Sequence, residues 1–207
     1  MIAKDRQSHW ENVYTTKSEA EVSWFQETPA LSCDLLNFVG ATRTSSIIDI
    51  GGGASRLVDS LVAQGYENVT VLDLSEAALA AAKARIGDKK DQVTWIVCDV
   101  TIWEPVATYD VWHDRAAFHF LTDPADQTAY IARLRLALRP GGHAIIGTFA
   151  LNGPEKCSGL PVIRYSAESL GKTLGPGFVL VDERINEHLT PWGAMQKFQF
   201  STFRFTP

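Results

Sequence analysis

The chain has 207 residues, of which 45% are hydrophobic and 21% charged, and its formal net charge at pH 7 is −5. This length and composition fit one globular domain large enough for a sheet covered on both faces, and they exclude a disordered chain. The acidic balance, with no run of Lys and Arg, argues against a nucleic-acid partner, because such partners usually require a basic surface.

The sequence has no segment typical of export or membrane insertion. No apolar stretch approaches the ~20 residues that a membrane span requires, and residues 1–6 are polar and lack the apolar core of a secretory signal. Cys33, Cys98 and Cys157 show neither the paired spacing of a disulfide framework nor that of a zinc site. We therefore expect a cytoplasmic protein with reduced thiols, no membrane contact and no bound metal.

Strand-like and helical patterns alternate through most of the chain. A short helical stripe follows the first strand, and an Ala-rich helix over residues 76–86 follows the second, with Ser75 as its predicted cap. Asp123 before Pro124 marks the start of a third helix, which should end at residues 139–142. The strand-like runs cover residues 46–50, 69–74, 93–100, 109–113 and 143–149. This alternation predicts βαβ units and a mostly parallel sheet.

The last thirty residues have a different pattern. Residues 178–184 and 195–205 read as strands joined around residues 190–193, and the second strand has one aromatic face. Two strands joined by a short connection pair antiparallel. The tail therefore predicts an antiparallel hairpin that closes the parallel sheet.

Residues 46–55 read Ser-Ile-Ile-Asp-Ile-Gly-Gly-Gly-Ala-Ser, a buried apolar run that ends in an acidic residue and three glycines. Because an amphipathic helix follows at once, the turn between strand and helix is suited to a nucleotide-sized ligand. A dinucleotide fingerprint would require a further glycine where the chain has Arg56. The spacing therefore argues against an NAD-dependent oxidoreductase.

Asp49, Gly51, Gly53 and Ser55 form the pattern acidic-x-Gly-x-Gly-x-(Gly/Ser). This pattern resembles the first motif of class I S-adenosylmethionine (SAM)-dependent methyltransferases, and the resemblance continues at matching intervals through most of the chain. It implies that the turn, Gly52 included, binds SAM, which leaves as S-adenosylhomocysteine (SAH).

The resemblance also implies the architecture. We expect an α/β fold with a doubly wound, mostly parallel seven-stranded sheet, closed by the C-terminal antiparallel hairpin. Residues 1–207 would form a single methyltransferase domain, in which residues 1–45 are an N-terminal helical lid.

Two acidic residues stand where strands end. Asp73 lies about twenty residues past the glycine turn, where a carboxylate can accept both hydroxyls of a ribose. The resemblance implies this role for Asp73, with Leu74 beside it, and implies that Asp99 accepts the adenine amino group while Val100 flanks the ring. Two alternatives remain open: Asp73 as a solvated acid that caps the next helix, and Asp99 as a loop residue bonded to nearby backbone.

Residues 109–120 leave the sheet where this fold places the methionine half of SAM and the methyl acceptor. The stretch 114–117, Asp-Arg-Ala-Ala, resembles thiopurine and related thiol methyltransferases, and more loosely the Asp-Lys-Gly-Thr stretch of some protein-lysine methyltransferases. If a side chain assists catalysis, Asp114 and His113 are the candidates, and His113 is also a candidate cofactor contact. The alternative is that His113 is an ordinary core or surface histidine.

Aromatic residues interrupt the polar N-terminal segment. Trp10 and Tyr14 are one helical turn apart, so they could line the same wall of a pocket. The family often folds such a helix over SAM, and an aromatic face near the sulfonium would attract its charge and exclude water. Plain packing of the helix on the domain is the alternative.

The resemblance implies a SAM-dependent methyltransferase that acts on a small-molecule acceptor, a thiol or another soft nucleophile. Residues 151–164 and 188–192 lie near the rim where acceptors usually enter this fold, so we expect them to set specificity. A protein-lysine methyltransferase and a non-catalytic SAM-binding protein are the alternatives.

Overall fold

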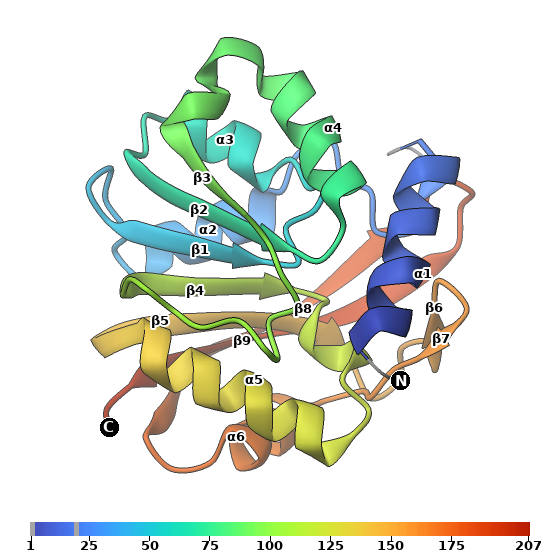
Figure 1. Ribbon diagram of the computed structural model, residues 1–207. Helices are drawn as coiled ribbons and strands as arrows, with labels where there is room; N and C mark the ends of the chain where they lie inside the picture. The colour runs from blue at the N-terminus through green and yellow to red at the C-terminus, as the bar shows by residue number, and fades with distance from the viewer. Residues whose placement is uncertain (1–2, 19–20) are drawn as a thin grey trace.

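The computed structural model describes residues 3–18 and 21–207, and its centre is a seven-stranded sheet with the strand order β3-β2-β1-β4-β5-β9-β8 (Figure 1). Neighbouring strands among the first five pair parallel, whereas β9 pairs antiparallel with β5 and with β8. The strands are β1 (Ser46–Ile50), β2 (Asn68–Asp73), β3 (Val93–Val97), β4 (Tyr109–Arg115), β5 (Leu138–Phe149), β8 (Phe178–Leu189) and β9 (Met195–Phe205). The predicted parallel sheet with its closing hairpin is confirmed.

Helices cover both faces of this sheet. The remaining elements are α1 (Ala3–Thr16), α2 (Ala30–Phe38), α3 (Leu57–Ala63), α4 (Glu76–Ile86), α5 (Pro124–Ala137), α6 (Ala167–Leu174), the 3-10 segments η2 (Gly87–Gln92) and η3 (Phe118–Phe120), and the short strands β6 (Lys156–Cys157) and β7 (Leu160–Pro161). Apolar residues of α2, α3 and α4 pack in one cluster, and those of α5 and α6 pack in the other. Alternate residues of each central strand enter opposite clusters, since side chains of a strand alternate between its faces.

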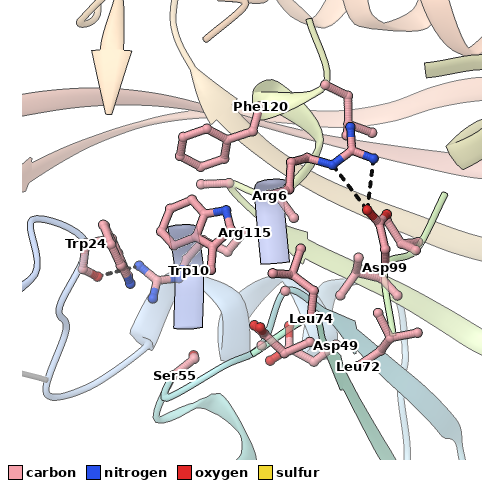
Figure 2. A pocket seen from close by; sticks show the side chains of 18 of the residues that line it. Arg6, Trp10, Trp24, Asp49, Ser55, Leu72, Leu74, Asp99, Arg115 and Phe120 are labelled. Carbon is pink, nitrogen blue, oxygen red and sulfur yellow. Dashed lines mark hydrogen bonds and ion pairs between the residues drawn. The ribbon is translucent and has the colours of Figure 1, made fainter. Parts of the chain in front are cut away.

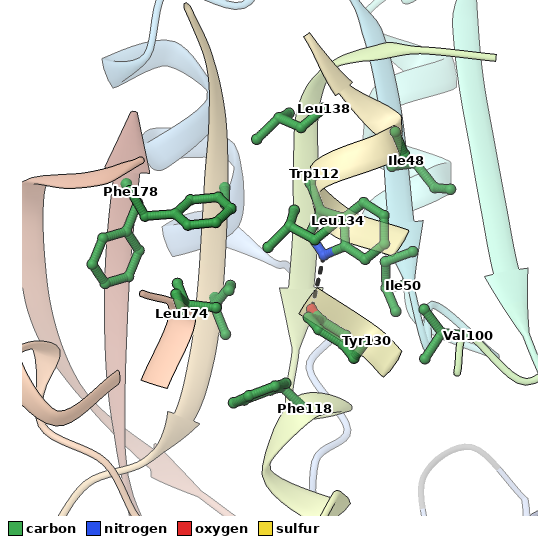
Figure 3. Packing of buried hydrophobic residues seen from close by; sticks show 14 of the residues in the cluster. Ile48, Ile50, Val100, Trp112, Phe118, Tyr130, Leu134, Leu138, Leu174 and Phe178 are labelled. Atoms are coloured by element: carbon green, nitrogen blue, oxygen red, sulfur yellow. Dashed lines mark hydrogen bonds between the residues drawn. The ribbon is translucent and has the colours of Figure 1, made fainter. Parts of the chain in front are cut away.

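The cluster under α5 contains a buried polar chain among its apolar side chains. Trp112 Nε1 donates to the hydroxyl of Tyr130 at 2.8 Å (Figure 3). That hydroxyl in turn donates to Asp114 Oδ2 at 2.6 Å. All three residues are fully buried. Each of these buried polar groups has a partner, so the hydrogen bonds offset the cost of burying them and link α5 to β4.

The local signals in the sequence account for the helix starts. Ser75 Oγ accepts from the backbone of Ala78, and the Asp123 carboxylate accepts from Ala125 with Pro124 in the first turn. Helix α5 ends at Ala137, just before the predicted stop at residues 139–142, but the strand predicted over residues 143–149 already begins at Leu138. A shift in register between Tyr109 and Val111 absorbs the Pro-Gly-Gly residues within the strand pair.

The carboxyl ends of the parallel strands meet at one edge of the sheet, and α1 lies across that edge (Figure 1). There, β3 ends at Val97, earlier than predicted, so Asp99 lies in the following turn. In contrast, β4 extends to Arg115. Within residues 3–18 and 21–207, no helix is long and apolar enough to cross a membrane.

Candidate functional site

The glycine turn after β1 leaves no room for side chains. Gly51 and Gly53 have positive φ angles of 63° and 44°, which glycine adopts most readily. A Cβ on Gly51 would lie 2.8 Å from Ala117 Cβ, and one on Gly53 would lie 2.8 Å from Asp73 Oδ2. The backbone therefore approaches both β2 and the segment after β4 at distances that only glycine permits.

A cavity opens beside this turn, beneath α1. Most of the predicted cofactor residues line it: Trp10, Tyr14, Asp49, Gly51, Gly52, Ser55, Asp73, Leu74, Asp99 and Val100. The structure thus brings together residues from α1 and from the ends of β1, β2 and β3. His113, Asp114 and Gly53 do not line the cavity. Gly53 instead packs closely against Asp73 and Tyr14.

Asp73 is a buried carboxylate that lines the cavity. Its Oδ1 accepts from the backbone of Ser75 at 2.8 Å. Burial, together with the nearby charge of Asp49, raises the pKa of Asp73 to about 7. A carboxylate so desolvated gains from hydroxyl donors, so the site fits a ribose here. The Ser75 contact also shows that Asp73 supports the start of α4, but Asp73 is buried rather than solvated, and the cap itself is Ser75.

The Asp99 carboxylate already accepts hydrogen bonds from other residues of this chain. Its Oδ2 accepts from Arg6 Nε at 3.1 Å and Arg6 Nη2 at 2.9 Å, while Oδ1 accepts from the backbone and hydroxyl of Thr101 at 2.9 and 2.7 Å (Figure 2). Arg6 also pairs with Asp126 on α5. The carboxylate predicted to receive an adenine amino group is therefore part of a buried latch that holds α1 on the sheet.

Sequence reasoning missed Arg6, although a signal was available. Arg6, Trp10 and Tyr14 follow one another at intervals of four residues, so they share one face of α1. All three line the cavity. A second contact from the same helix, Glu11, accepts from Ser75 Oγ at 2.8 Å and so reaches the start of α4.

His113 does not reach the cavity itself, and it is linked to the cavity through its hydrogen bond to Asp49. Its Nδ1 donates to Asp49 Oδ1 at 2.7 Å, and its Nε2 lies 2.9 Å from Ser32 Oγ on α2. His113 and Ser32 are buried, with 1% and 2% of their surface exposed. The imidazole thus links α2 to the first strand and sets the orientation of the Asp49 carboxylate, which does line the cavity.

Asp114 organises the turn that follows β4. Its Oδ1 accepts from the backbone of Ala117 at 2.7 Å, and its Oδ2 accepts from the backbone of Phe118 at 3.0 Å and from Tyr130. Burial raises the pKa of Asp114 to about 6. These bonds place Arg115, Ala116 and Ala117 against the cavity, whereas the carboxylate itself faces the core.

Aromatic rings close the cavity on the side of α1. The ring of Trp10 lies 5.5 Å from that of Trp24 and 4.9 Å from that of Phe120, measured between centroids. Arg115 Nη1 donates to the carbonyl of Trp24 at 2.9 Å (Figure 2), and burial lowers the pKa of this guanidinium. Sequence reasoning did not predict three of these site residues, Trp24, Phe120 and Arg115. Their proximity to one another depends on how the segment after α1 folds back onto the segment after β4.

The described residues include no group of three or more His, Cys, Asp and Glu side chains that could hold a metal ion. The chemistry of the cavity thus lies in its carboxylates, its glycine turn and its aromatic wall. Together these groups suit a nucleoside that carries a positive charge, because carboxylates accept from sugar hydroxyls and aromatic faces attract cations.

Comparisons with known proteins agree with this geometry. A family model described as a methyltransferase domain matches residues 47–142. The N-terminal Xaa-Pro-Lys N-methyltransferase 1 of Rattus norvegicus is 29% identical over 143 residues, which is 64% of this chain and 64% of that protein. The eEF1A lysine and N-terminal methyltransferase of Mus musculus is 26% identical over 122 residues, 58% of this chain and 17% of that protein. The chain therefore spans less than two thirds of the length of either relative.

A solved structure shares the fold over almost the whole chain. The 1,6-didemethyltoxoflavin-N1-methyltransferase of Burkholderia thailandensis, solved with 1,6-didemethyltoxoflavin and SAH, superposes with a TM-score of 0.72. It is 23% identical, and the alignment covers 99% of this chain and 89% of that one. Strand order, glycine motif and domain match agree: the chain carries a methyltransferase domain over residues 47–142 and has the fold of class I SAM-dependent methyltransferases.

Proposed function

We propose that this protein transfers the methyl group of SAM to a small-molecule acceptor, a thiol or another soft nucleophile, and releases SAH. The observation that carries the proposal is the cavity in which Asp73, the glycine turn and the aromatic wall of α1 meet at the carboxyl ends of the strands. The proposal extends to a single domain over residues 1–207. It also includes a cytoplasmic location, since all three cysteines are free and disulfides are rare there.

The cavity residues would divide the contacts with SAM among them. Asp73 would accept the ribose hydroxyls, Leu74 and Val100 would flank the adenine ring, and Asp49 would face the turn with its orientation set by His113. Asp99 would reach the adenine amino group after Arg6 releases Oδ2.

Helix α1 would act as a lid in this scheme. The cavity beneath it holds about 100 Å³, less than the 300–1,000 Å³ common for small-molecule sites. Entry of a nucleoside therefore requires α1 to shift outward, and the buried Arg6–Asp99 pair would be the contact that breaks.

Bound SAM would supply a methyl group on a positively charged sulfur. Attack forms a bond from the acceptor atom to the methyl carbon, the carbon–sulfur electron pair passes to sulfur, and a protonated acceptor loses its proton to solvent. The chain needs only to align the two reactants, which can contribute roughly 7–11 kcal/mol. Trp10, Tyr14 and Trp24 would exclude water and attract the positive charge.

Asp114 and His113 were the predicted catalytic residues, and we propose that both act by positioning. Asp114 would hold the turn that carries Arg115, and His113 would hold Asp49. A thiol acceptor needs no strong base, because thiols are partly ionised near neutral pH.

Methylation of a protein amine is the second candidate. The two relatives described above are named as N-terminal or lysine methyltransferases, and their acceptors are amines on proteins. A non-catalytic role, in which SAM binds without transfer, is the third.

Calorimetry with SAM, SAH and NADH tests the cofactor. We expect heat from SAM and SAH and none from NADH, and binding of NADH alone would refute the proposal. Incubation with radiolabelled SAM then separates the acceptors: transfer to added thiols or other small molecules supports it, whereas label confined to protein bands supports the protein methyltransferase. Tight SAM binding with no transfer to any acceptor supports the non-catalytic role.

A further inference from the structure

A second hollow shares two lining side chains with the cofactor cavity. It is bordered by α1, the segment from Glu21 to Trp24, the β6–β7 hairpin and the turn between β8 and β9, and it holds about 570 Å³. We call it the rim groove. Trp24 and Cys157 line both spaces, so a molecule in the rim groove lies against the same side chains as a ligand in the cavity.

Two buried polar atoms in the rim groove have no hydrogen-bond partner among the described residues. They are Gln196 Oε1 and His9 Nε2. Gln196 is only 7% exposed. Buried polar groups are normally paired, and a carbonyl oxygen can only accept. Since Gln196 lines the groove, a small rotation of its side chain would offer this unpaired oxygen to an N–H or O–H group supplied from outside the chain.

The charges around the rim groove favour an acid. Lys17 and Lys156 both line it. Among the residues that the structure describes, its one carboxylate is Glu21, which already accepts from the backbone and hydroxyl of Ser18 at 2.9 and 2.6 Å. A cationic rim on a chain whose net charge is −5 would attract a carboxylate, and it would repel an ammonium group or a basic peptide.

Two tryptophans line the groove. Trp24 also lines the cavity, and Trp192, 61% exposed, lies on the turn between β8 and β9. An exposed tryptophan beside a hollow offers a flat apolar surface for a ring.

We propose that the rim groove is the acceptor site, and that it takes a planar ring bearing a carboxylate and an N–H or O–H group. The ring stacks against the tryptophans, the donor pairs with Gln196 Oε1, and the carboxylate faces Lys17 and Lys156. This inference rests on the proposed function, because it supplies the acceptor for SAM. It also assigns residues 156–159 and Trp192, from the two loops expected to set specificity, to that task.

Three ring-matched probes test the charge preference. Calorimetry first establishes that SAH binds, and the SAH-loaded protein is then titrated with indole-3-acetate, 3-methylindole and tryptamine. We expect indole-3-acetate to bind at least tenfold more tightly than the other two, and the K17A/K156A double variant to lose that preference. If SAH fails to bind, the proposed function fails. If SAH binds but indole-3-acetate binds no better than tryptamine, or none of the three binds, only this inference is overturned.

Gln196 offers a test with a matched control in the same strand. Gln199 is equally buried, at 6%, but its Nε2 donates to the carbonyl of Phe200 at 2.9 Å. Gln196→Leu removes an unpaired oxygen, so we expect an unchanged or higher melting temperature together with at least tenfold weaker binding of indole-3-acetate. Gln199→Leu removes a made hydrogen bond, so the melting temperature should fall while the binding stays within twofold. A fall in melting temperature for Gln196→Leu with binding unchanged would show that Gln196 is structural.

Discussion

Replacing Arg6 with methionine tests whether α1 is held on the sheet by its ion pair. Arg6 and Asp99 are each 7% exposed, and the guanidinium gives Asp99 Oδ2 two hydrogen bonds. Removing one partner of a buried pair costs about 3–5 kcal/mol. Asp99 keeps both donors from Thr101, and water can reach it once α1 lifts. We therefore expect Arg6→Met to lower the free energy needed to open α1 by about 2–3 kcal/mol.

Hydrogen exchange measures this opening directly. A loss of about 2–3 kcal/mol corresponds to roughly a 30- to 150-fold increase in the open population. The amides of Trp10, Val13 and Tyr14 should therefore exchange faster by that factor, while amides in β1 and β4 keep their rates. Because the Arg6–Asp99 pair would already be broken when the nucleoside is bound, SAH should also associate faster with the variant in stopped-flow measurements.

A matched control comes from an exposed ion pair. Lys172 pairs with Glu168 at 2.6 Å, but their side chains are 74% and 78% exposed, and such pairs contribute little. Lys172→Met should leave exchange in α1 unchanged. If Arg6→Met changes the exchange of α1 amides by less than twofold, the latch does not hold the helix and the reasoning is refuted.

Three further predictions follow from the cavity. Burial raises the pKa of Asp73 to about 7, so the folded protein binds this proton between pH 4 and 7, where the unfolded chain has lost it. The free energy of unfolding should therefore fall as pH rises through that window, and Asp73→Asn should flatten the fall in chemical denaturation; an identical pH profile would contradict the assignment. Gly53→Ala and Gly87→Ala both add a Cβ at positive φ, but only the first meets a neighbour within 4 Å. Both should lose about 1–2 kcal/mol of stability from the strained backbone, with Gly53→Ala losing more because its Cβ meets Asp73. Only Gly53→Ala should weaken SAM binding by tenfold or more in calorimetry; equal binding by the two variants would count against a role of the glycine turn in binding SAM. His113→Leu leaves the Asp49 carboxylate buried without its donor, so the free energy of unfolding should fall by about 3 kcal/mol in urea, and SAM affinity should fall more than kcat. A loss confined to kcat would instead indicate a direct catalytic role for His113.

The fold could be predicted from the sequence because its signals are local. Asp123 before Pro124 starts α5, and Ser75 caps α4, through bonds that span three residues or fewer. The closing hairpin followed from two strand-like runs with a short connection, and β8 and β9 pair antiparallel as expected. The start of β5 was missed because the irregular register opposite Tyr109 depends on the neighbouring strand, which a single segment does not encode.

The chain order alone brought the glycine turn, Asp73 and Asp99 to one edge, since parallel strands end on the same side of a sheet. It also placed Trp10 and Tyr14 on one helical face. These parts of the site follow from periodicity and from the direction of the strands, which are properties of short stretches of sequence.

Only the tertiary structure decided what each side chain does there. Arg6 is 93 residues from Asp99 in sequence, and the two meet because α1 crosses the edge of the sheet. His113 and Asp114 stand in a strand whose two faces are both covered, so their polar atoms turn to Asp49, Ser32 and the following backbone rather than to the cavity. A sequence pattern specifies which residues reach an edge, whereas burial and long-range pairing determine which of their atoms remain available to a ligand.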